Sequence, residues 1–146
     1  FVAPRVTSTG SKALEIPMAK KRLFISFDVD HDAGTKTMLA GQADHADSPF
    51  EFKDASVTAH LTGDWQEKVR RRMENVDVVA FLCGEHTHTA AGVAAELRIV
   101  KEMGKDYFLL RAYKDKVCTR PTSAKSDEKL YSWTWDNLKI LIGGGR

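Results

Sequence analysis

The chain of 146 residues has 42% hydrophobic and 29% charged side chains, the size and composition of one globular domain with a core of its own. Its 22 basic and 20 acidic residues give a formal net charge of +2, which offers no electrostatic case for nucleic acid or a membrane as the main partner. No apolar run approaches the ~20 residues of a membrane span, and two cysteines are too few for a disulfide framework, so we expect reduced thiols and a cytoplasmic protein.

The first residues differ from the rest of the chain. Residues 1–17 contain two prolines and show no hydrophobic periodicity, and Met18 resembles a natural start. We expect residues 1–17 to be a leader, a linker, an expression remnant or a native arm, and residues 18–146 to form the domain.

Apolar runs and helical periodicity alternate through the first half of the domain. Residues 22–27 (RLFISF) predict a buried strand, and residues 32–42 predict a short helix that contains two glycines. Residues 50–57 predict a second strand, whose mixture of charged and apolar side chains is typical of a sheet edge. A helix is expected from an N-cap at Asp64 to residue 75. Its apolar face comprises Trp65, Val69 and Met73.

The second half continues the same alternation. Residues 76–83 (VDVVAFLC) form the most apolar run, as a central parallel strand buried on both faces requires. Residues 89–103 predict a helix with Gly104 as its C′ residue. Residues 106–113 (DYFLLRAY) predict a fourth strand, and after a polar loop residues 131–142 predict a closing helix.

Strands that alternate with helices at this spacing predict an α/β fold in which a central parallel sheet lies between two helical layers. We expect the strand order 2-1-3-4, with room for a fifth strand. In such a sheet, ligands bind outside the carboxyl ends of the strands, where the strand order reverses. This rule selects the segments 28–35 and 84–89, which follow the first and third strands.

The segment after the third strand combines small, hydroxyl and imidazole side chains with the start of a helix. Because free N–H groups at a helix start suit phosphate or pyrophosphate, we expect ligand binding here. The candidates are Gly84, His86, Thr87 and Thr89. The alternative is a capped helix whose small residues permit close packing on the sheet. His86 and His88 form a His-x-His pair, but no cysteine or carboxylate follows at zinc spacing, so we expect no metal.

Glu96 is the only charged residue between Glu85 and Arg98, and it lies beside the apolar stripe of its predicted helix. A partly buried carboxylate costs free energy unless it is paired, so its presence near a predicted ligand site indicates a role. A carboxylate here could stabilise an oxocarbenium-like transition state or bind ribose hydroxyls, as in glycosyl transfer. The alternative is an exposed helical glutamate with Arg98 or Lys101 nearby.

Three acidic residues, Asp28, Asp30 and Asp32, follow the first strand. Clustered carboxylates at this place could hold Mg²⁺, as in receiver domains of the same topology, but a receiver also needs an aspartate at the end of the third strand, and residues 81–84 contain none. We therefore interpret the segment as a solvated turn with Asp32 as a helix N-cap. The chain also lacks the glycine-rich fingerprints of dinucleotide-dependent dehydrogenases and P-loop NTPases.

Several segments together point to one family. They are residues 21–28 (KRLFISFD), 48–50 (SPF), 54–56 (DAS), 83–89 (CGEHTHT), 92–97 (GVAAEL) and 131–138 (YSWTWDNL). In this order they resemble the bacterial TIR-like domains of flavodoxin-like fold, and are similar to the TIR component of Thoeris anti-phage systems. The resemblance covers about residues 20–144.

The resemblance implies an activity as well as a fold. Catalytic TIR domains cleave the nicotinamide–ribose bond of NAD⁺, or cyclise the ADP-ribose product into a second messenger, through which a separate effector protein would be reached. They require no metal, and NAD⁺ is the substrate rather than a cofactor. Their catalytic glutamate stands before leucine or isoleucine in the helix after the third strand, a position that Glu96-Leu97 matches.

The loops after the first two strands form further walls of the family's site. Here the resemblance implies Phe27 and Asp28 from the first loop, and Asp54 and Ser56 from the second. In many TIR assemblies the second loop comes from a neighbouring subunit, so the resemblance also implies self-association. The chain departs from animal and plant TIR domains in having Ala94-Ala95 where these have Trp-Cys before the glutamate.

Two other functions remain open at this point. A nucleoside deoxyribosyltransferase also uses a glutamate after the third strand, often with Gly-Lys before the next strand, as in Gly104-Lys105 here. A non-catalytic adaptor would act through TIR–TIR assembly alone. For an adaptor, Glu96→Gln would leave cellular function intact, whereas surface substitutions in residues 57–64 would abolish it.

Overall fold

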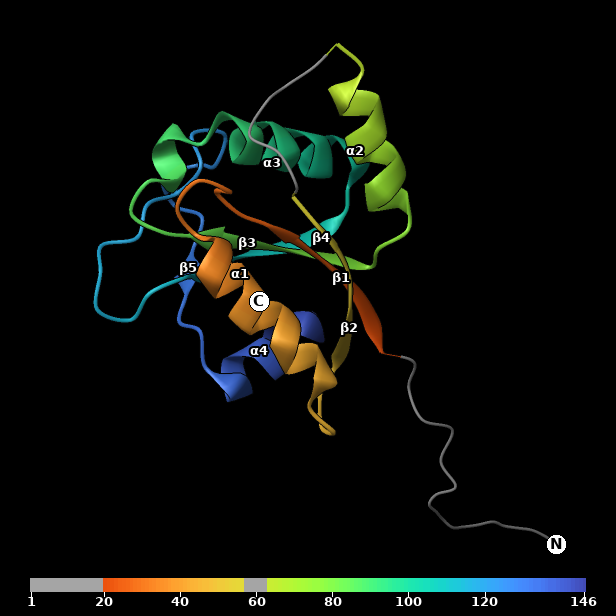
Figure 1. Ribbon diagram of the computed structural model, residues 1–146, viewed down its shortest axis with the longest axis vertical. Coiled ribbons are helices and arrows are strands. Elements are labelled where there is room, and N and C mark those ends of the chain that lie inside the picture. The colour runs from red at the N-terminus through yellow and green to blue at the C-terminus, as the bar shows by residue number, and fades with distance from the viewer. Residues whose placement is uncertain (1–19, 57–62) are drawn as a thin grey trace, which may run out of the picture.

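Five parallel strands form one sheet in the order β2-β1-β3-β4-β5 in the computed structural model, which describes residues 20–56 and 63–146 (Figure 1). The strands are β1 (Lys21–Ser26), β2 (Phe50–Ala55), β3 (Val78–Cys83), β4 (Asp106–Arg111) and β5 (Leu130–Tyr131). The predicted order of four strands and the additional fifth strand are confirmed. The expected leader, residues 1–17, lies outside the described residues.

Helices cover both faces of the sheet (Figure 1). The helices α2 (Trp65–Glu74) and α3 (Ala91–Met103) lie on one face, and α1 (Ala33–Gly41) and α4 (Trp135–Ile142) lie on the other. This arrangement gives the three layers that the sequence predicts. None of the helices in the described part of the chain is both long enough and apolar enough to cross a membrane.

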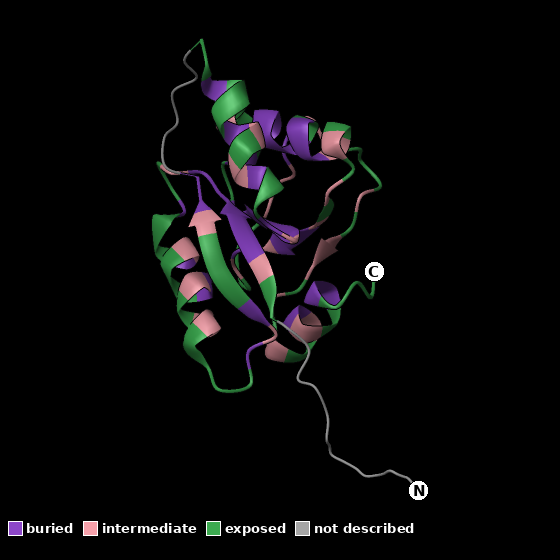
Figure 2. Cartoon of the chain, turned by 90° about the vertical axis from the view of Figure 1, so that its right-hand side faces the viewer, coloured by how far each residue is buried: buried purple, intermediate pink, exposed green. Residues whose placement is uncertain are grey.

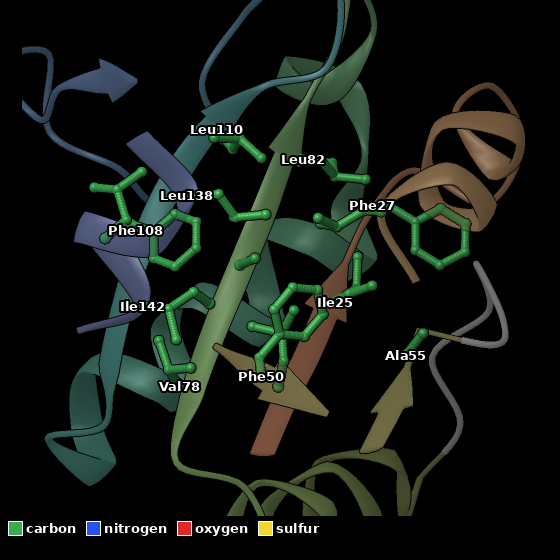
Figure 3. Close-up of a cluster of buried hydrophobic side chains, with 14 of the residues drawn as sticks. Ile25, Phe27, Phe50, Ala55, Val78, Leu82, Phe108, Leu110, Leu138 and Ile142 are labelled. Carbon is green, nitrogen blue, oxygen red and sulfur yellow. The ribbon is translucent and has the colours of Figure 1, made fainter. Parts of the chain in front are cut away.

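The central strand β3 connects the two halves of the core because its side chains alternate between the faces. Val78 and every second residue after it contact the layer of α1 and α4 (Figure 3), while Val79 and its alternates contact α2 and α3. All six residues of β3 are buried, as a central parallel strand requires. Cys83, the last of them, is a free cysteine, and burial raises the pKa of its thiol.

The strand β2 forms one edge of the sheet, as predicted. Residues 51–53 in its middle are exposed (Figure 2), and Phe52 has 40% of its surface in contact with solvent. The neighbouring helix α2 buries its predicted apolar face against the sheet. Its buried residues are Trp65, Val69 and Met73. At the other end of the domain, Gly104 ends α3 with a φ of 64°, the left-handed conformation that glycine adopts without strain.

The prediction of a helix from residue 131 is wrong over residues 131–134. Tyr131 pairs with Leu110 as part of β5. The helix α4 begins only after Thr134, whose hydroxyl accepts a hydrogen bond from the N–H of Asn137 at 3.1 Å. A two-residue strand has no periodicity of its own, so this N-cap threonine is the local signal that separates strand from helix.

Candidate active site

A cavity of about 210 Å³ lies between the turn after β1, the residue after β2 and the beginning of α3. This is the place where the strand order reverses, since β1 lies between β2 and β3. Many of the residues that the sequence predicts for the site line this cavity. They are Phe27, Asp28, Ser56, Thr89 and Glu96. The rule for the reversal of strand order therefore locates the cavity from sequence alone.

Glu96 places a buried carboxyl group in this cavity, with 3% of the residue exposed. Its Oε1 accepts hydrogen bonds from the hydroxyls of Ser26 at 2.6 Å and Ser56 at 2.5 Å. Ser26 is the last residue of β1 and Ser56 directly follows β2, so the glutamate reaches from the helix to the edge of the sheet. The alternative of an exposed helical glutamate is wrong, because hydroxyls from two strands hold its carboxyl group.

Burial raises the pKa of Glu96 to about 7, because a carboxylate is poorly solvated in this position. The hydrogen bonds from Ser26 and Ser56 and the charge of Arg72 act in the opposite direction, since they favour the ionised form. Near neutral pH the carboxyl group therefore exchanges between its protonated and ionised forms. A carboxyl group with this property inside a cavity is a marker of a functional site.

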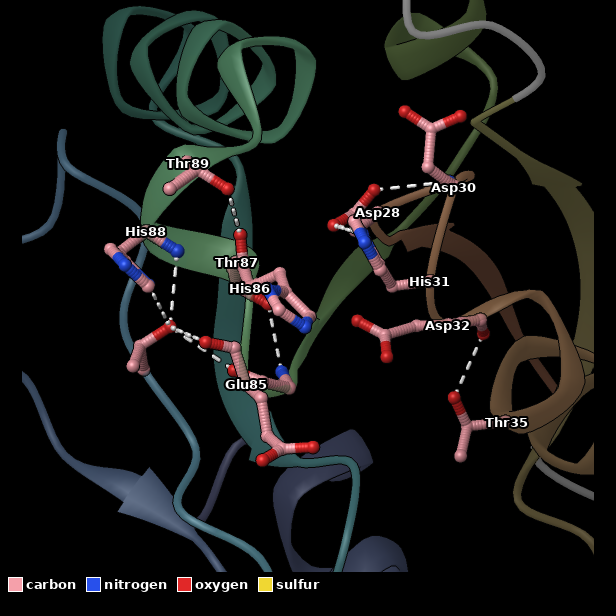
Figure 4. Close-up of polar contacts among 12 residues, drawn as sticks. Asp28, Asp30, His31, Asp32, Thr35, Glu85, His86, Thr87, His88 and Thr89 are labelled. Carbon is pink, nitrogen blue, oxygen red and sulfur yellow. Dashed lines mark hydrogen bonds and ion pairs between the residues drawn. The ribbon is translucent and has the colours of Figure 1, made fainter.

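The turn after β1 is organised by Asp28, whose side chain is 7% exposed. Asp28 accepts hydrogen bonds from the backbone N–H of Asp30 at 3.0 Å and from Nδ1 of His31 at 2.7 Å (Figure 4). The ring of His31 stacks on the ring of His86, with centroids 4.0 Å apart. The turn forms as predicted, but the expectation that it is solvated is wrong for Asp28, because the buried carboxyl group is the acceptor that holds the turn together.

Asp32 is another buried carboxyl group at this end of the sheet, with 2% of the residue exposed. It occupies the predicted N-cap position of α1, but its side chain caps no backbone N–H. Its Oδ1 accepts a hydrogen bond from the hydroxyl of Tyr113 at 2.8 Å, and its Oδ2 has no hydrogen-bond partner among the described residues. The carboxyl group packs against Gly84, and burial raises the pKa of Asp32.

The other predicted site residues do not line the cavity. Gly84 donates its N–H to Oγ1 of the buried Thr87 at 2.7 Å, which folds the segment after β3 into a turn. His86 stacks on His31, and Asp54 forms an ion pair with Arg72 at 3.4 Å. The part of the expected second loop at residues 57–62 lies outside the described residues. Within the described ranges, no group of three or more His, Cys, Asp or Glu side chains is placed to hold a metal ion.

The helix α3 begins at Ala91, two residues later than predicted, because the short helix η2 (Thr87–Thr89) and an extended Ala90 precede it. The first hydrogen bond of α3 runs from the N–H of Ala94 to the carbonyl of Ala90. The N–H groups of residues 91–93 come before it, and these residues line the cavity. The helix start that borders the cavity is thus 91–93, and of the predicted segment His86–Thr89 only Thr89 lines the cavity.

Sequence reasoning missed two polar side chains here: Ser26, which donates a hydrogen bond to Glu96, and His31, which lines the cavity. Ser26 is the only polar side chain inside the run 23–27, and a hydroxyl in a strand buried on both faces needs a partner. His31 follows Asp28 by three residues, the spacing of a side-chain contact across a turn. Both signals are present in the sequence, but neither predicts the contact of Ser26 with Glu96 or of His31 with His86.

A larger cavity of about 1080 Å³ lies beside α1 and β5. Its side chains are mainly apolar and aromatic, with Met38, Trp133 and Trp135 among them, and its charged groups are Arg111 and Lys114. No Asp, Glu or His stands among its described lining residues. The smaller cavity is the candidate site, because it contains the buried carboxyl group of Glu96, whose pKa is raised by burial.

A parallel sheet of this order, with a buried glutamate in the helix after the third strand and a cavity at the reversal of strand order, defines a TIR-like α/β domain. Residues 24–117, more than half of the chain, match the family model of the Thoeris protein ThsB, TIR-like domain. The chain belongs to this family, and the match supports a role in anti-phage defence signalling. The matched range contains every residue that lines the Glu96 cavity. No curated protein sequence matches the chain significantly.

Proposed function

We propose that the chain is an enzyme that cleaves the nicotinamide–ribose bond of NAD⁺, with Glu96 as the catalytic residue. The observation that carries this proposal is the buried carboxyl group of Glu96, which two serine hydroxyls hold at the cavity between the first and third strands. When the bond between C1′ and the nicotinamide nitrogen breaks, positive charge develops on the ribose. An ionised Glu96 next to that carbon stabilises the charge more strongly than it stabilises the substrate.

The remainder of the dinucleotide has a binding surface at the start of α3. Residues 91–93 line the cavity beside Glu96, and their N–H groups, which precede the first hydrogen bond of α3, suit the pyrophosphate. The cavity of about 210 Å³ is smaller than the ~300–1,000 Å³ of a typical small-molecule site. We infer that it takes the nicotinamide riboside end, and that a neighbouring copy completes the site after self-association.

The acceptor decides the product and its use. Water gives ADP-ribose, and a group of the same molecule gives a cyclic nucleotide that signals to a separate effector protein. No metal or further cofactor enters this reaction. The free Cys83 and Cys118 fit a reducing compartment, and the proposed site of action is the cytoplasm.

The test is NAD⁺ turnover by the purified chain at high concentration, read by chromatography and mass spectrometry. We expect nicotinamide release by the wild-type protein and a loss of at least about 10²-fold in Glu96→Gln. Glu102→Gln is the matched control, because it changes an exposed glutamate on the same helix, and it retains the activity.

Light scattering on the same samples establishes whether the chain has assembled. An assembled, folded wild-type protein that leaves NAD⁺ intact contradicts the proposal. Cleavage of deoxynucleosides by that protein would assign a deoxyribosyltransferase, and cellular protection that survives Glu96→Gln would assign an adaptor.

A further inference from the structure

A second titratable side chain stands on the wall of the cavity opposite α3. His31 lines the same cavity as Glu96, but it comes from the turn after β1. Its Nδ1 lies 2.7 Å from Oδ2 of Asp28. The side chain of Asp28 is 7% exposed, and that of His31 is 46% exposed. A buried acceptor thus holds an imidazole that is itself accessible from the cavity and from solvent.

The contacts of His31 fix both its position and its tautomer. A carboxylate can only accept a hydrogen bond, so Nδ1 of the neutral ring carries the proton and Nε2 keeps a free lone pair. The Oδ1 of Asp28 is held in turn by the N–H of Asp30 at 3.0 Å. The ring of His86 stacks on His31 at 4.0 Å with an interplanar angle of 26° (Figure 4). This is the arrangement of a general base that a carboxylate orients.

We propose that His31, oriented by Asp28, is the general base that takes the proton of the acceptor during glycosyl transfer. This inference rests on the proposed function and assigns a second role at the same site. Glu96 is buried and hydrogen-bonded to two serines, which suits the stabilisation of a cation. His31 is accessible and has a free ring nitrogen, which suits proton transfer. The two titratable side chains lie in different environments, as expected of groups with different roles in one site.

The proposed reaction is a substitution at C1′ of the ribose. The C1′–N bond breaks, and its electron pair leaves with neutral nicotinamide. The oxygen of water, or of a hydroxyl of the same molecule, forms the new bond to C1′. The proton of that oxygen passes to Nε2 of His31 and from there to solvent, to which the imidazole is open. No oxidant, metal or other reactant is needed.

The charges around His31 determine its pH dependence. Asp28, Asp30 and Asp32 of its own segment raise the pKa of His31, with the hydrogen bond to Asp28 as the largest cause. His86 faces the ring from the segment after β3, and Glu96 faces the same cavity from α3. A base must be unprotonated to act, so acceptor-dependent turnover rises with pH as His31 loses its proton, above the ordinary imidazole value of 6.5.

The experiment compares two acceptors on one enzyme. Hydrolysis, or cyclisation through a hydroxyl of the same molecule, uses an acceptor that must lose a proton. Exchange of nicotinamide for an added pyridine uses a nitrogen nucleophile that has none to lose. In His31→Gln we expect the ratio of hydrolysis to exchange to fall by about 10²-fold. We also expect that ratio to lose its rise with pH, whereas ionisation of Glu96 still affects both reactions alike. His45→Gln is the matched control and leaves the ratio unchanged, because His45 is exposed, follows α1 in the sequence and does not line the cavity.

The outcomes separate this inference from the proposed function. Loss of both reactions in Glu96→Gln, together with selective loss of hydrolysis in His31→Gln, supports both. Hydrolysis at wild-type rate with an unchanged pH profile in His31→Gln overturns the role of His31 alone. An equal fall of both reactions in a folded His31→Gln protein also overturns it, because it marks a binding or structural residue. Absence of both reactions in assembled wild-type protein overturns the proposed function and this inference with it.

Discussion

The pKa values of carboxyl groups are shifted in opposite directions at the two ends of the parallel sheet. At the amino ends of β1 and β3, Asp77 accepts hydrogen bonds from the backbone N–H of Arg22 at 2.8 Å and from two guanidinium nitrogens at 3.1 Å. These contacts lower the pKa of Asp77 to about 2. At the carboxyl ends, burial raises the pKa of both Glu96 and Asp32.

Carboxyl groups at the amino ends of the strands therefore contribute to stability, whereas those at the carboxyl ends lie at the candidate site and reduce stability. An ion pair at the amino ends connects β1 to the residue before β3 and favours the folded chain. Buried carboxyl groups at the carboxyl ends disfavour folding when they ionise, since the unfolded chain solvates them better. Such a cost is expected where a side chain is kept for chemistry rather than for folding.

Glu96→Gln should show the largest effect on stability. The pKa of Glu96 is about 7 in the folded chain and 4.5 in its ordinary state, so ionisation costs folding free energy that grows from about pH 4.5 and is complete above pH 7. We expect the variant to be more stable than the wild type at pH 8 by up to about 3 kcal/mol, with a smaller difference at pH 5. Urea unfolding at both pH values measures it.

Glu102→Gln provides the comparison, because Glu102 is exposed on the same helix. Its stability relative to the wild type should not grow between pH 5 and pH 8. If the stability of Glu96→Gln relative to the wild type also stays constant between pH 5 and pH 8, ionisation of Glu96 does not oppose folding. The proposed difference between the two ends of the sheet would then be wrong for Glu96.

Gly84→Ala should produce the next largest effect. A Cβ at position 84 would lie 2.7 Å from both carboxyl oxygens of Asp32. Asp32 is buried and bonded to Tyr113, so it cannot move aside without losing that bond. We expect a loss of about 2 kcal/mol in thermal or urea unfolding.

Gly34→Ala tests the same substitution where there is space. An added Cβ at position 34 in α1 meets nothing within 4 Å, and alanine is the better helix former, so stability should rise by about 0.5–1 kcal/mol. Equal responses at positions 84 and 34 would show that Asp32 does not constrain the segment after β3.

Most of the fold is readable from the sequence because each central strand carries its own apolar run. The run 76–83 predicts β3, and the mixed charge of residues 50–57 predicts the edge position of β2. The boundary between β5 and α4 is not predictable in this way. Residues 131–134 have the apolar and aromatic character of a helix face, but the pairing of Tyr131 with Leu110 depends on a distant strand.

The residues of the candidate site differ in the same way: some have a local sequence signal, and others depend on contacts between distant segments. Glu96 stands out because it is the only charge in a long uncharged segment, and this local signal is enough to place it. His31 has a local signal in its spacing from Asp28, but its stacking on His86 brings in another segment, and no local pattern contains that contact. Thr87 was predicted as a ligand contact from its neighbourhood, whereas its hydroxyl accepts the N–H of Gly84 and shapes the turn.

Asp77→Asn at the amino ends should have the smallest effect and the opposite pH dependence. A carboxyl group with a folded pKa near 2 and an ordinary value of 3.8 contributes stability that is present above about pH 3.8 and is lost as the pH falls toward 2. Because the Asp77 side chain is 35% exposed, solvent screening limits the loss in the variant to about 1 kcal/mol or less at pH 7. Urea unfolding at pH 7 and pH 2.5 should show the two proteins converging in acid, whereas Glu96→Gln and wild type diverge in base. A difference in unfolding free energy between the two proteins that persists at pH 2.5 would mean that the substitution removes a neutral hydrogen bond rather than a charge. The two ends of the sheet would then differ in packing and not in electrostatics.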